Sequence, residues 1–221
     1  MRIDILTLFP NMFDNFLSES IIKRAIENKL VEVNIINFRD YSKDPHHKVD
    51  DTPYGGGSGM LLTIQPIYDA IMDLKKENTK VILLTPDGIK YKQNIAYQLS
   101  EEKHIILICG HYEGFDERIR TIIDLEISIG DYVLTGGELP SMVISDSIIR
   151  LLKGVIEEES HLNDSFNNDL LDYPNYTKPR EFKGLLVPDV LLNGNHKEIM
   201  EYRKKESLRK TQEKRPDLLE R

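Results

Sequence analysis

The sequence predicts an α/β fold with a mainly parallel sheet. Short apolar runs alternate along the chain with segments whose apolar residues recur at helical spacing. This alternation is typical of βαβ units, in which helices cover both faces of a parallel sheet. Three of the apolar runs lead directly into glycine-bearing loops, and such folds bind ligands where loops leave the carboxyl ends of the strands. We therefore expect one small-molecule site built from three loops.

The elements follow one another in a regular order. A strand is expected at Ile3–Phe9, then a helix at Asn15–Lys29 and a half-buried strand at Val31–Phe38. The charged, glycine-rich segment Asp40–Gly59 predicts a mobile loop. The alternation resumes with helices at residues 64–76 and 93–100, strands at 81–84, 105–109 and 125–129, and a helix at 138–153.

The pattern changes after Gly154. Residues 157–171 are polar and lack apolar periodicity, which predicts a linker, whereas residues 195–211 regain helical composition. We therefore expect three regions: a ligand-binding domain at 1–156, a flexible linker or lid at 157–171, and a small, mostly helical domain at 172–221.

Composition excludes several classes of protein. The net charge of −8 argues against a protein that coats nucleic acid indiscriminately, although nine Lys or Arg against six Asp or Glu make residues 196–221 basic. By itself, such a mixed-charge run is more typical of a solvated helix. The single cysteine, Cys109, rules out a disulfide framework, and no apolar run approaches the length of a membrane span. A cytoplasmic protein without a membrane segment is expected.

The usual nucleotide motifs are absent. A dinucleotide site needs G-x-G-x-x-G after the first strand, but the turn at residues 8–12 contains no glycine, and the chain has no G-x-x-x-x-G-K-[ST]. The three later loops contain almost no cation. They therefore suit a ligand with little phosphate charge that is bound by backbone groups, and S-adenosylmethionine is such a ligand.

Four motifs, in the same order along the chain, resemble those of the bacterial tRNA (guanine-N1)-methyltransferases. They are Asp50–Met60, Cys109–Arg118, Ile129–Pro140 and Leu191–His196, and the resemblance extends over essentially the full length. It implies a SPOUT-type parallel sheet with a deep C-terminal trefoil knot. It also implies a homodimer in which each site combines the N-terminal domain of one subunit with the C-terminal domain of the other. Periodicity alone predicts no knot, because ordinary folds are unthreaded.

The resemblance also implies the reaction. S-adenosylmethionine would methylate N1 of the guanine 3′-adjacent to the anticodon, in tRNAs where another guanine precedes it. N1 carries a proton at neutral pH, so a general base is required. The resemblance assigns Asp164 as this base and Arg150 as the group that stabilises charge on guanine O6. From the residues alone, Asp164 reads more simply as a capping residue and Arg150 as a helix residue that extends to solvent. His111 is the second candidate for the base.

The binding residues are assigned in the same way, by matching motif positions. Glu113 is a candidate ligand for Mg²⁺ or for the methionine part of the cofactor. The tRNA-binding candidates are Tyr54, Asp172, Tyr176, Lys178 and Arg180, with Tyr173 and the basic tail beside them. The cofactor-binding candidates are Leu84, Thr85, Pro86, Gly88, Gly110, Tyr112, Glu113, Gly114, Ile129, Gly130, Asp131, Tyr132, Val133, Leu134, Gly136, Gly137 and Pro140. Taken singly, the glycines and prolines are also ordinary turn residues.

Two alternatives belong to other classes. A NAD(P)-dependent oxidoreductase would share the α/β sheet. A non-catalytic RNA-binding protein on a methyltransferase-like fold would keep the basic tail without the chemistry.

Overall fold

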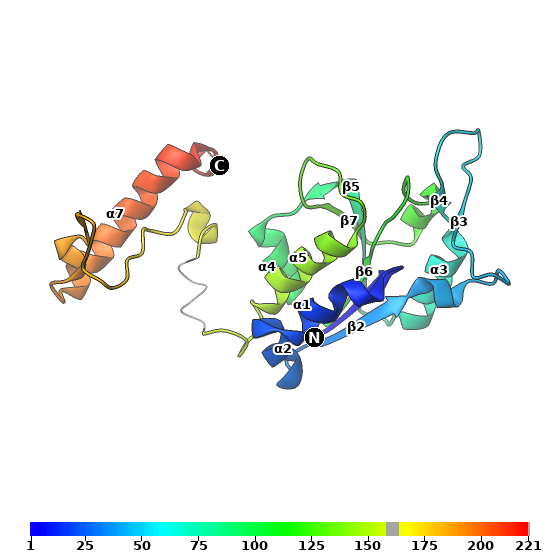
Figure 1. Cartoon of the computed structure of the whole chain (residues 1–221), viewed down its shortest axis with the longest axis horizontal. Coiled ribbons are helices and arrows are strands. Elements are labelled where there is room, and N and C mark those ends of the chain that lie inside the picture. The colour runs from blue at the N-terminus through cyan, green and yellow to red at the C-terminus, as the bar shows by residue number, and fades with distance from the viewer. Residues whose placement is uncertain (158–163, 221) are drawn as a thin grey trace. The chain divides into compact units, whose positions relative to one another are not determined.

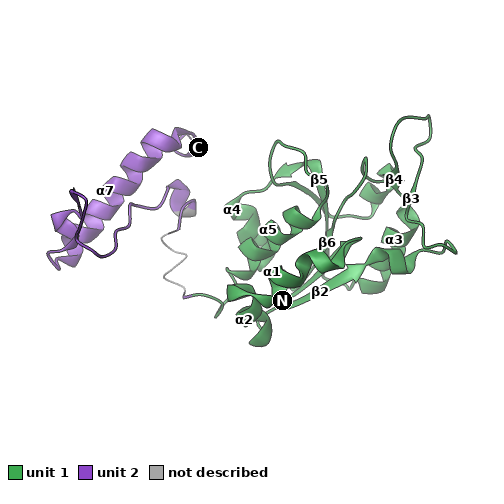
Figure 2. Cartoon of the chain, in the orientation of Figure 1, with its two compact units in different colours: residues 1–156 green, residues 157–221 purple. Residues whose placement is uncertain are grey.

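A computed structural model describes residues 1–157 and 164–220 and divides the chain into two compact units (Figure 1). Unit 1 comprises Met1–Ile156 and unit 2 comprises Glu157–Arg221 (Figure 2). Part of the expected linker, residues 158–163, lies outside the described residues. Within those that are described, no helix is long and apolar enough to cross a membrane.

Unit 1 is built on a five-stranded, entirely parallel sheet, which confirms the predicted α/β class. The strand order is β2-β1-β6-β5-β7, so the chain begins near one edge of the sheet and its fifth parallel strand forms the other edge. The strands are β1 (Arg2–Thr7), β2 (Glu32–Asn37), β5 (Thr79–Lys90), β6 (His104–Ile108) and β7 (Leu125–Ser128).

Helices cover both faces of the sheet. Alternate strand residues point to opposite sides, so apolar side chains on both faces need helices to bury them. In β6, Ile105 and Leu107 join one buried cluster while Ile106 and Ile108 join the other. Residues of α2 (Ser20–Glu27), α4 (Gln93–Ser100) and α5 (Glu138–Ile149) pack into the first cluster. The second cluster takes in α3 (Ile64–Leu74), with the short 3-10 helices η2 (Phe38–Tyr41) and η3 (Glu117–Thr121).

The expected helix at Asn15–Lys29 is two helices, α1 (Asp14–Ser18) and α2, preceded by η1 (Pro10–Phe13). The backbone of Glu19 is extended and Ser20 has a positive φ of 56°, so the helix is interrupted and the chain changes direction there. Apolar periodicity continues across this point, so the pattern alone did not reveal the break. α5 also ends earlier than expected, at Ile149.

Two expected loops contain strand structure. Within Asp40–Gly59, β3 (Asp50–Asp51) pairs antiparallel with β4 (Leu61–Leu62), so the glycine-rich segment between them forms a flap with a paired base. β5 extends beyond Leu84 to Lys90, with a register shift between Leu84 and Ile89. Gly88 permits this extension, because a Cβ there would lie 2.5 Å from the backbone nitrogen of Ile127 in β7.

Unit 2 is organised around one long helix, α7 (His196–Lys214), capped by the Asn195 side chain. The backbone of Leu171 is tied to this helix, because its carbonyl accepts from Ser207 Oγ and its N–H donates to Thr211 Oγ1. The remaining elements are short: η4 (Asn167–Asp169), β8 (Glu181–Phe182) paired with β9 (Leu185–Leu186), η5 (Asp189–Leu191) and η6 (Pro216–Leu218).

Candidate active site

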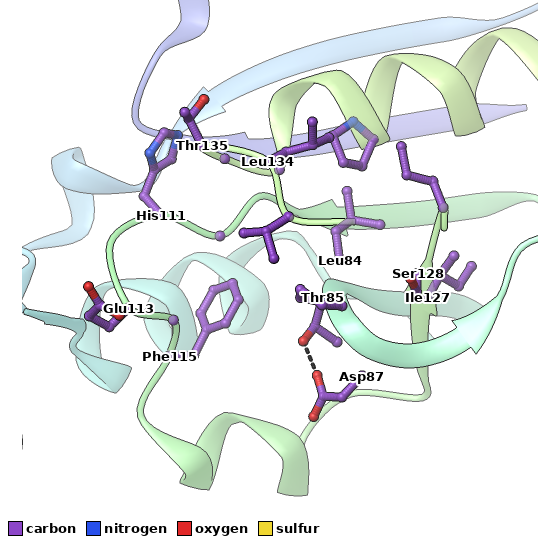
Figure 3. Close-up of a pocket in the computed structure, with 18 of the residues that line it drawn as sticks. Leu84, Thr85, Asp87, His111, Glu113, Phe115, Ile127, Ser128, Leu134 and Thr135 are labelled. Atoms are coloured by element: carbon purple, nitrogen blue, oxygen red, sulfur yellow. Dashed lines mark hydrogen bonds between the residues drawn. The ribbon is translucent and has the colours of Figure 1, made fainter. Parts of the chain in front are cut away.

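A cavity of about 530 Å³ lies in unit 1 at the carboxyl ends of β6 and β7, beside residues 84–87 in the middle of β5 (Figure 3). The three loops predicted from the sequence form its walls, together with the first turn of α5. Fifteen of the seventeen cofactor-binding candidates line it: Leu84, Thr85, Pro86, Gly110, Tyr112, Glu113, Gly114, Ile129, Gly130, Tyr132, Val133, Leu134, Gly136, Gly137 and Pro140.

Glycine brings the loops into direct backbone contact. A Cβ on Gly137 would lie 2.5 Å from the Cα of Cys109, and the Gly137 N–H donates a 2.9 Å hydrogen bond to the carbonyl of Gly110. A Cβ on Gly110 would lie 2.8 Å from the Phe115 ring. Because side chains are excluded at these points, peptide groups form part of the cavity wall, as a ligand bound by backbone groups requires.

Gly88 and Asp131 do not line this cavity. Gly88 packs against the backbone of β7, as described above. The Asp131 carboxylate forms an ion pair with Lys90 Nζ at 2.8 Å, and the Asp131 side chain is 86% exposed. In the described structure, Gly88 is therefore a packing residue and Asp131 is an exposed loop residue.

Arg120 is the one Lys or Arg side chain among the described residues that line the cavity. Its guanidinium already forms ion pairs with acidic side chains. Arg120 lies 2.7 Å from an oxygen of Asp87 and 2.9 Å from an oxygen of Glu117, and it also pairs with Glu126. A hydrogen bond from Thr85, followed by the charge of Arg120, outweighs burial and lowers the pKa of Asp87. This wall therefore offers no unengaged cation to a phosphate.

Sequence reasoning missed several lining residues. Phe115, Glu117 and Thr135 lie within two of the four motifs without having been assigned a role, and the others adjoin the three loops: Asp87, Arg120, Ile127 and Ser128. His111, considered only as an alternative base, also lines the cavity (Figure 3). Adjacency to a predicted loop was the one signal that could have found them.

The two predicted catalytic residues belong to different units, and neither is among the lining residues of the cavity. Arg150 directly follows the last residue of α5, and this twelve-residue helix is about 18 Å long, so Arg150 lies far from the cavity at the other end. Asp164 is half-buried and belongs to unit 2.

No metal centre is evident. Among the described residues, no three His, Cys, Asp or Glu side chains form a group that could hold a metal ion. Glu113 instead adjoins the flap, because its N–H donates to the carbonyl of Met60 at 3.0 Å and a Cβ on Gly59 would lie 2.4 Å from its Cγ. Tyr54, in the same flap, is fully exposed.

Unit 2 contains a second cavity, of about 590 Å³, with aromatic and basic walls. The guanidinium carbon of Arg203 lies 4.7 Å from the centre of the Tyr173 ring, a cation–π contact. Three of the tRNA-binding candidates, Tyr176, Lys178 and Arg180, line this cavity with them. Arg180 also pairs with Asp189 at 2.9 Å.

Asp172 lies outside the lining of the second cavity. Its Oδ2 accepts a 2.8 Å hydrogen bond from Asn175, whereas its Oδ1 is buried and has no hydrogen-bond partner within the described part of the chain. Residues 172–221 nevertheless carry three more positive than negative charges, although the whole chain has a net charge of −8. The basic character of the chain is therefore concentrated in residues 172–221.

Comparison with known proteins agrees with this arrangement. Residues 1–221 match the family model described as tRNA (Guanine-1)-methyltransferase TrmD. A tRNA (guanine-N(1)-)-methyltransferase of Malacoplasma penetrans (strain HF-2) is 60% identical over 218 residues, which cover 99% of this chain and 96% of the relative. Proteins of the same name from Bacillus cereus (strain AH820) and Bacillus anthracis (strain A0248) are each 57% identical, covering 100% of this chain and 92% of theirs. The chain thus belongs to the tRNA (guanine-1)-methyltransferase family that its four motifs predicted.

Proposed function

We propose that this chain transfers a methyl group from S-adenosylmethionine to N1 of a guanine in tRNA. The target is the guanine 3′-adjacent to the anticodon, preceded by another guanine. One observation carries the proposal: a backbone-walled cavity, with its single arginine already paired, lies at the carboxyl ends of parallel strands in a chain that matches this family from end to end.

The cavity suits the methyl donor chemically. S-adenosylmethionine carries a sulfonium, an ammonium and a carboxylate but no phosphate, and the cavity has no unengaged cation that would favour a phosphate. Backbone N–H and C=O groups of the three loops that are not used within the fold can bind polar atoms of the ligand at close range. Leu84, Ile129 and Leu134 offer apolar surface for the adenine ring.

The reaction needs two groups beyond the cavity. The N1–CH₃ bond forms as the S–CH₃ bond breaks, S-adenosylhomocysteine leaves, and the N1 proton must move to a base. Asp164 takes this proton, and Arg150 stabilises the negative charge that develops on guanine O6. Packing of the RNA against Asp164 would desolvate its carboxylate, which would raise its basicity.

A homodimer would account for the position of Arg150. Residues 139, 143 and 150 fall within about 40° of one another around α5, because successive residues are 100° apart. Leu139 and Val143 are about half exposed, and Phe9 and Met12 of the neighbouring 3-10 segment are exposed as well. We propose that a second copy packs on this apolar face, so that Arg150 and Asp164 complete a site that both subunits share.

The trefoil knot is part of the same proposal. A knot requires one loop to pass closely across another, and glycine allows two backbones to approach tightly. The contact between Gly137 and Cys109 is an approach of this kind. We propose that the chain after β7 threads through the loop before it.

Unit 2 is proposed to bind the tRNA. Aromatic and arginine side chains can stack on unpaired bases, while basic side chains contact phosphates. The Tyr173–Arg203 pair, together with Tyr176, Lys178 and Arg180, provides both kinds of contact. The exposed Tyr54 is a further candidate, and Asp172 is kept as a candidate from its motif position, because its buried Oδ1 would have to be uncovered before it could bind a base edge. Magnesium enters no step here, because Glu113 has no partner carboxylate in a metal-binding arrangement among the described residues.

The two alternatives are disfavoured. The full-length match argues against an oxidoreductase, and the retained Asp164, Arg150 and three loops argue against a degenerate, non-catalytic relative. A thermal-shift comparison tests the oxidoreductase alternative, because S-adenosylmethionine, but not NAD(P), should raise the melting temperature of a methyltransferase.

The decisive test is single-turnover methylation of tRNA by Asp164→Ala. We expect the rate to fall by about 10² to 10⁴, as for loss of a general base, while the affinity for S-adenosylmethionine stays nearly unchanged. Asp169→Asn, which alters an exposed carboxylate of the same segment, is the matched control and should retain its rate. Unimpaired methylation by Asp164→Ala would exclude Asp164 as the base. An enzyme that methylates no guanine N1 would refute the function itself.

A further inference from the structure

A buried carboxylate connects three parts of the chain behind the cavity of unit 1. The Glu138 side chain is 2% exposed. Its Oε1 accepts a hydrogen bond from Thr7 Oγ1 at 2.6 Å, and its Oε2 lies 2.8 Å from Nε2 of His111. Thr7 ends β1, His111 lies in the loop after β6, and Glu138 begins α5. One side chain therefore ties a strand end, a cavity loop and a helix N-terminus together.

The hydrogen-bond donors around Glu138 decide the tautomer of His111. An ionised carboxylate can only accept hydrogen bonds. The Thr7 hydroxyl accepts from the Phe9 N–H at 2.9 Å and gives its own hydrogen to Glu138. With an ionised Glu138, Nε2 of His111 likewise carries the hydrogen, and in the neutral form of the ring Nδ1 is then left as an acceptor. Because His111 lines the cavity, Glu138 sets which nitrogen of this residue can accept a hydrogen bond there.

The ring of His111 has little room to adopt another position. A Cβ on Gly136 would lie 2.4 Å from His111 Nε2 and 2.6 Å from Glu138 Oε2, so the hydrogen bond lies directly against the backbone of the third loop. On another side, the centre of the Phe9 ring is 4.6 Å from the centre of the imidazole. Moving Glu138 or His111 would therefore disturb both glycine loops.

We propose that Glu138 is a positioning residue for the methyl donor. It fixes the orientation and tautomer of His111 and thereby holds residues 110–114 and 136–137 in the arrangement that binds S-adenosylmethionine. This inference rests on the proposed function of the cavity. Glu138 itself lies behind the wall and does not line the cavity, so it acts through His111 and the loop backbone.

The test uses the full-length Glu138→Gln variant, which keeps the side-chain shape but replaces one acceptor oxygen with an amide donor. We expect the dissociation constant for S-adenosylmethionine, measured by calorimetry, to rise about 10- to 100-fold, since hydrogen bonds to charged groups are the stronger ones. We expect kcat at saturating cofactor to change less than about threefold. The ¹⁵N shifts of the His111 ring should also move away from those of the Nε2–H tautomer. Glu77→Gln, on an exposed turn, is the matched control and should leave all three unchanged.

A second variant keeps the inference testable if Glu138→Gln fails to fold. His111→Ala removes the same link from the cavity side and should weaken cofactor binding by a similar factor, and the double variant should bind no more weakly than either single one. A folded Glu138→Gln protein with wild-type affinity or a wild-type His111 tautomer would overturn the proposal. So would a lower melting temperature with unchanged affinity, which would mark Glu138 as purely structural. If the wild-type protein binds no S-adenosylmethionine, the proposed function fails, while the tautomer measurement still tests the Glu138–His111 pair.

Discussion

Gly137→Ala probes the contact that joins the second and third loops. The added methyl group would lie 2.5 Å from the Cα and 3.0 Å from the carbonyl carbon of Cys109, and 2.7 Å from the backbone nitrogen of Gly110. These are backbone atoms at the end of a fully buried strand, so no side chain can rotate away to relieve the overlap. The loops must separate instead.

The magnitude follows from two contributions. Overpacking a well-ordered core costs about 1 to 3 kcal/mol, and a backbone obstacle places this site at the upper end. Separating the loops also breaks the hydrogen bond from Gly137 to Gly110, for about 1 kcal/mol more. We therefore expect Gly137→Ala to lower the free energy of unfolding by about 3 to 4 kcal/mol.

The assay is urea unfolding, together with calorimetric binding of S-adenosylmethionine. Gly184→Ala is the control, because Gly184 has a positive φ of 81° but no atom within 4 Å of the added methyl group. It should lose only about 1 kcal/mol through backbone strain and should keep its cofactor affinity. If Gly137→Ala were no less stable than Gly184→Ala, the loops would not meet as described.

Three further predictions concern other parts of the chain. Burial raises the pKa of Asp4, but hydrogen bonds from Arg2, Asn34 and His104 outweigh it and leave the pKa below its ordinary value. Asp4 therefore stabilises the fold above the unfolded pKa of about 3.9 and loses this effect as the pH falls through its lower folded pKa. At pH 7, Asp4→Asn should lower the free energy of unfolding by about 2 kcal/mol. Urea unfolding near pH 3 should show a smaller loss, and a loss that does not depend on pH would contradict this. Burial, and then the charge of Glu138, raises the pKa of the Cys109 thiol. A thiol reagent should therefore label the native protein only as fast as local unfolding exposes this residue. Rapid labelling would show an exposed thiol. Tyr173→Ala should weaken tRNA binding about tenfold in filter-binding titrations while Tyr173→Phe binds normally, as expected for stacking; equal affinities would exclude a stacking role.

Local patterns were sufficient for most elements of unit 1. The helix at Gln93–Ser100 was predicted with its observed bounds, and the strands that became β1, β6 and β7 were located to within two residues at each end. These elements alternate between faces or repeat at helical spacing, and periodicity records which side of a segment is buried. It does not record a change of backbone direction, so the break at Glu19 and the extension of β5 past Leu84 were missed.

The site was predicted in part for the same reason. Glycines after apolar runs indicated the three loops, because the carboxyl ends of parallel strands meet at one edge of a sheet. Arg120 carried no such signal, since it enters the cavity wall from a 3-10 helix and meets its acidic partners only through the fold. Gly88 and Asp131 show the reverse case, in which a motif position near the site does not line the cavity.

By itself, the sequence determined the fold class, the three loops that line the cavity and the family, because each depends on residue type and short spacing. Only the tertiary structure decided which atoms meet. Thr7 and Glu138 are 131 residues apart and share a 2.6 Å hydrogen bond, and the glycine at position 137 is needed because the backbone of Cys109 lies against it. Such contacts follow from the order of the strands and the paths of the loops, and long-range geometry of this kind leaves no periodic trace in a chain.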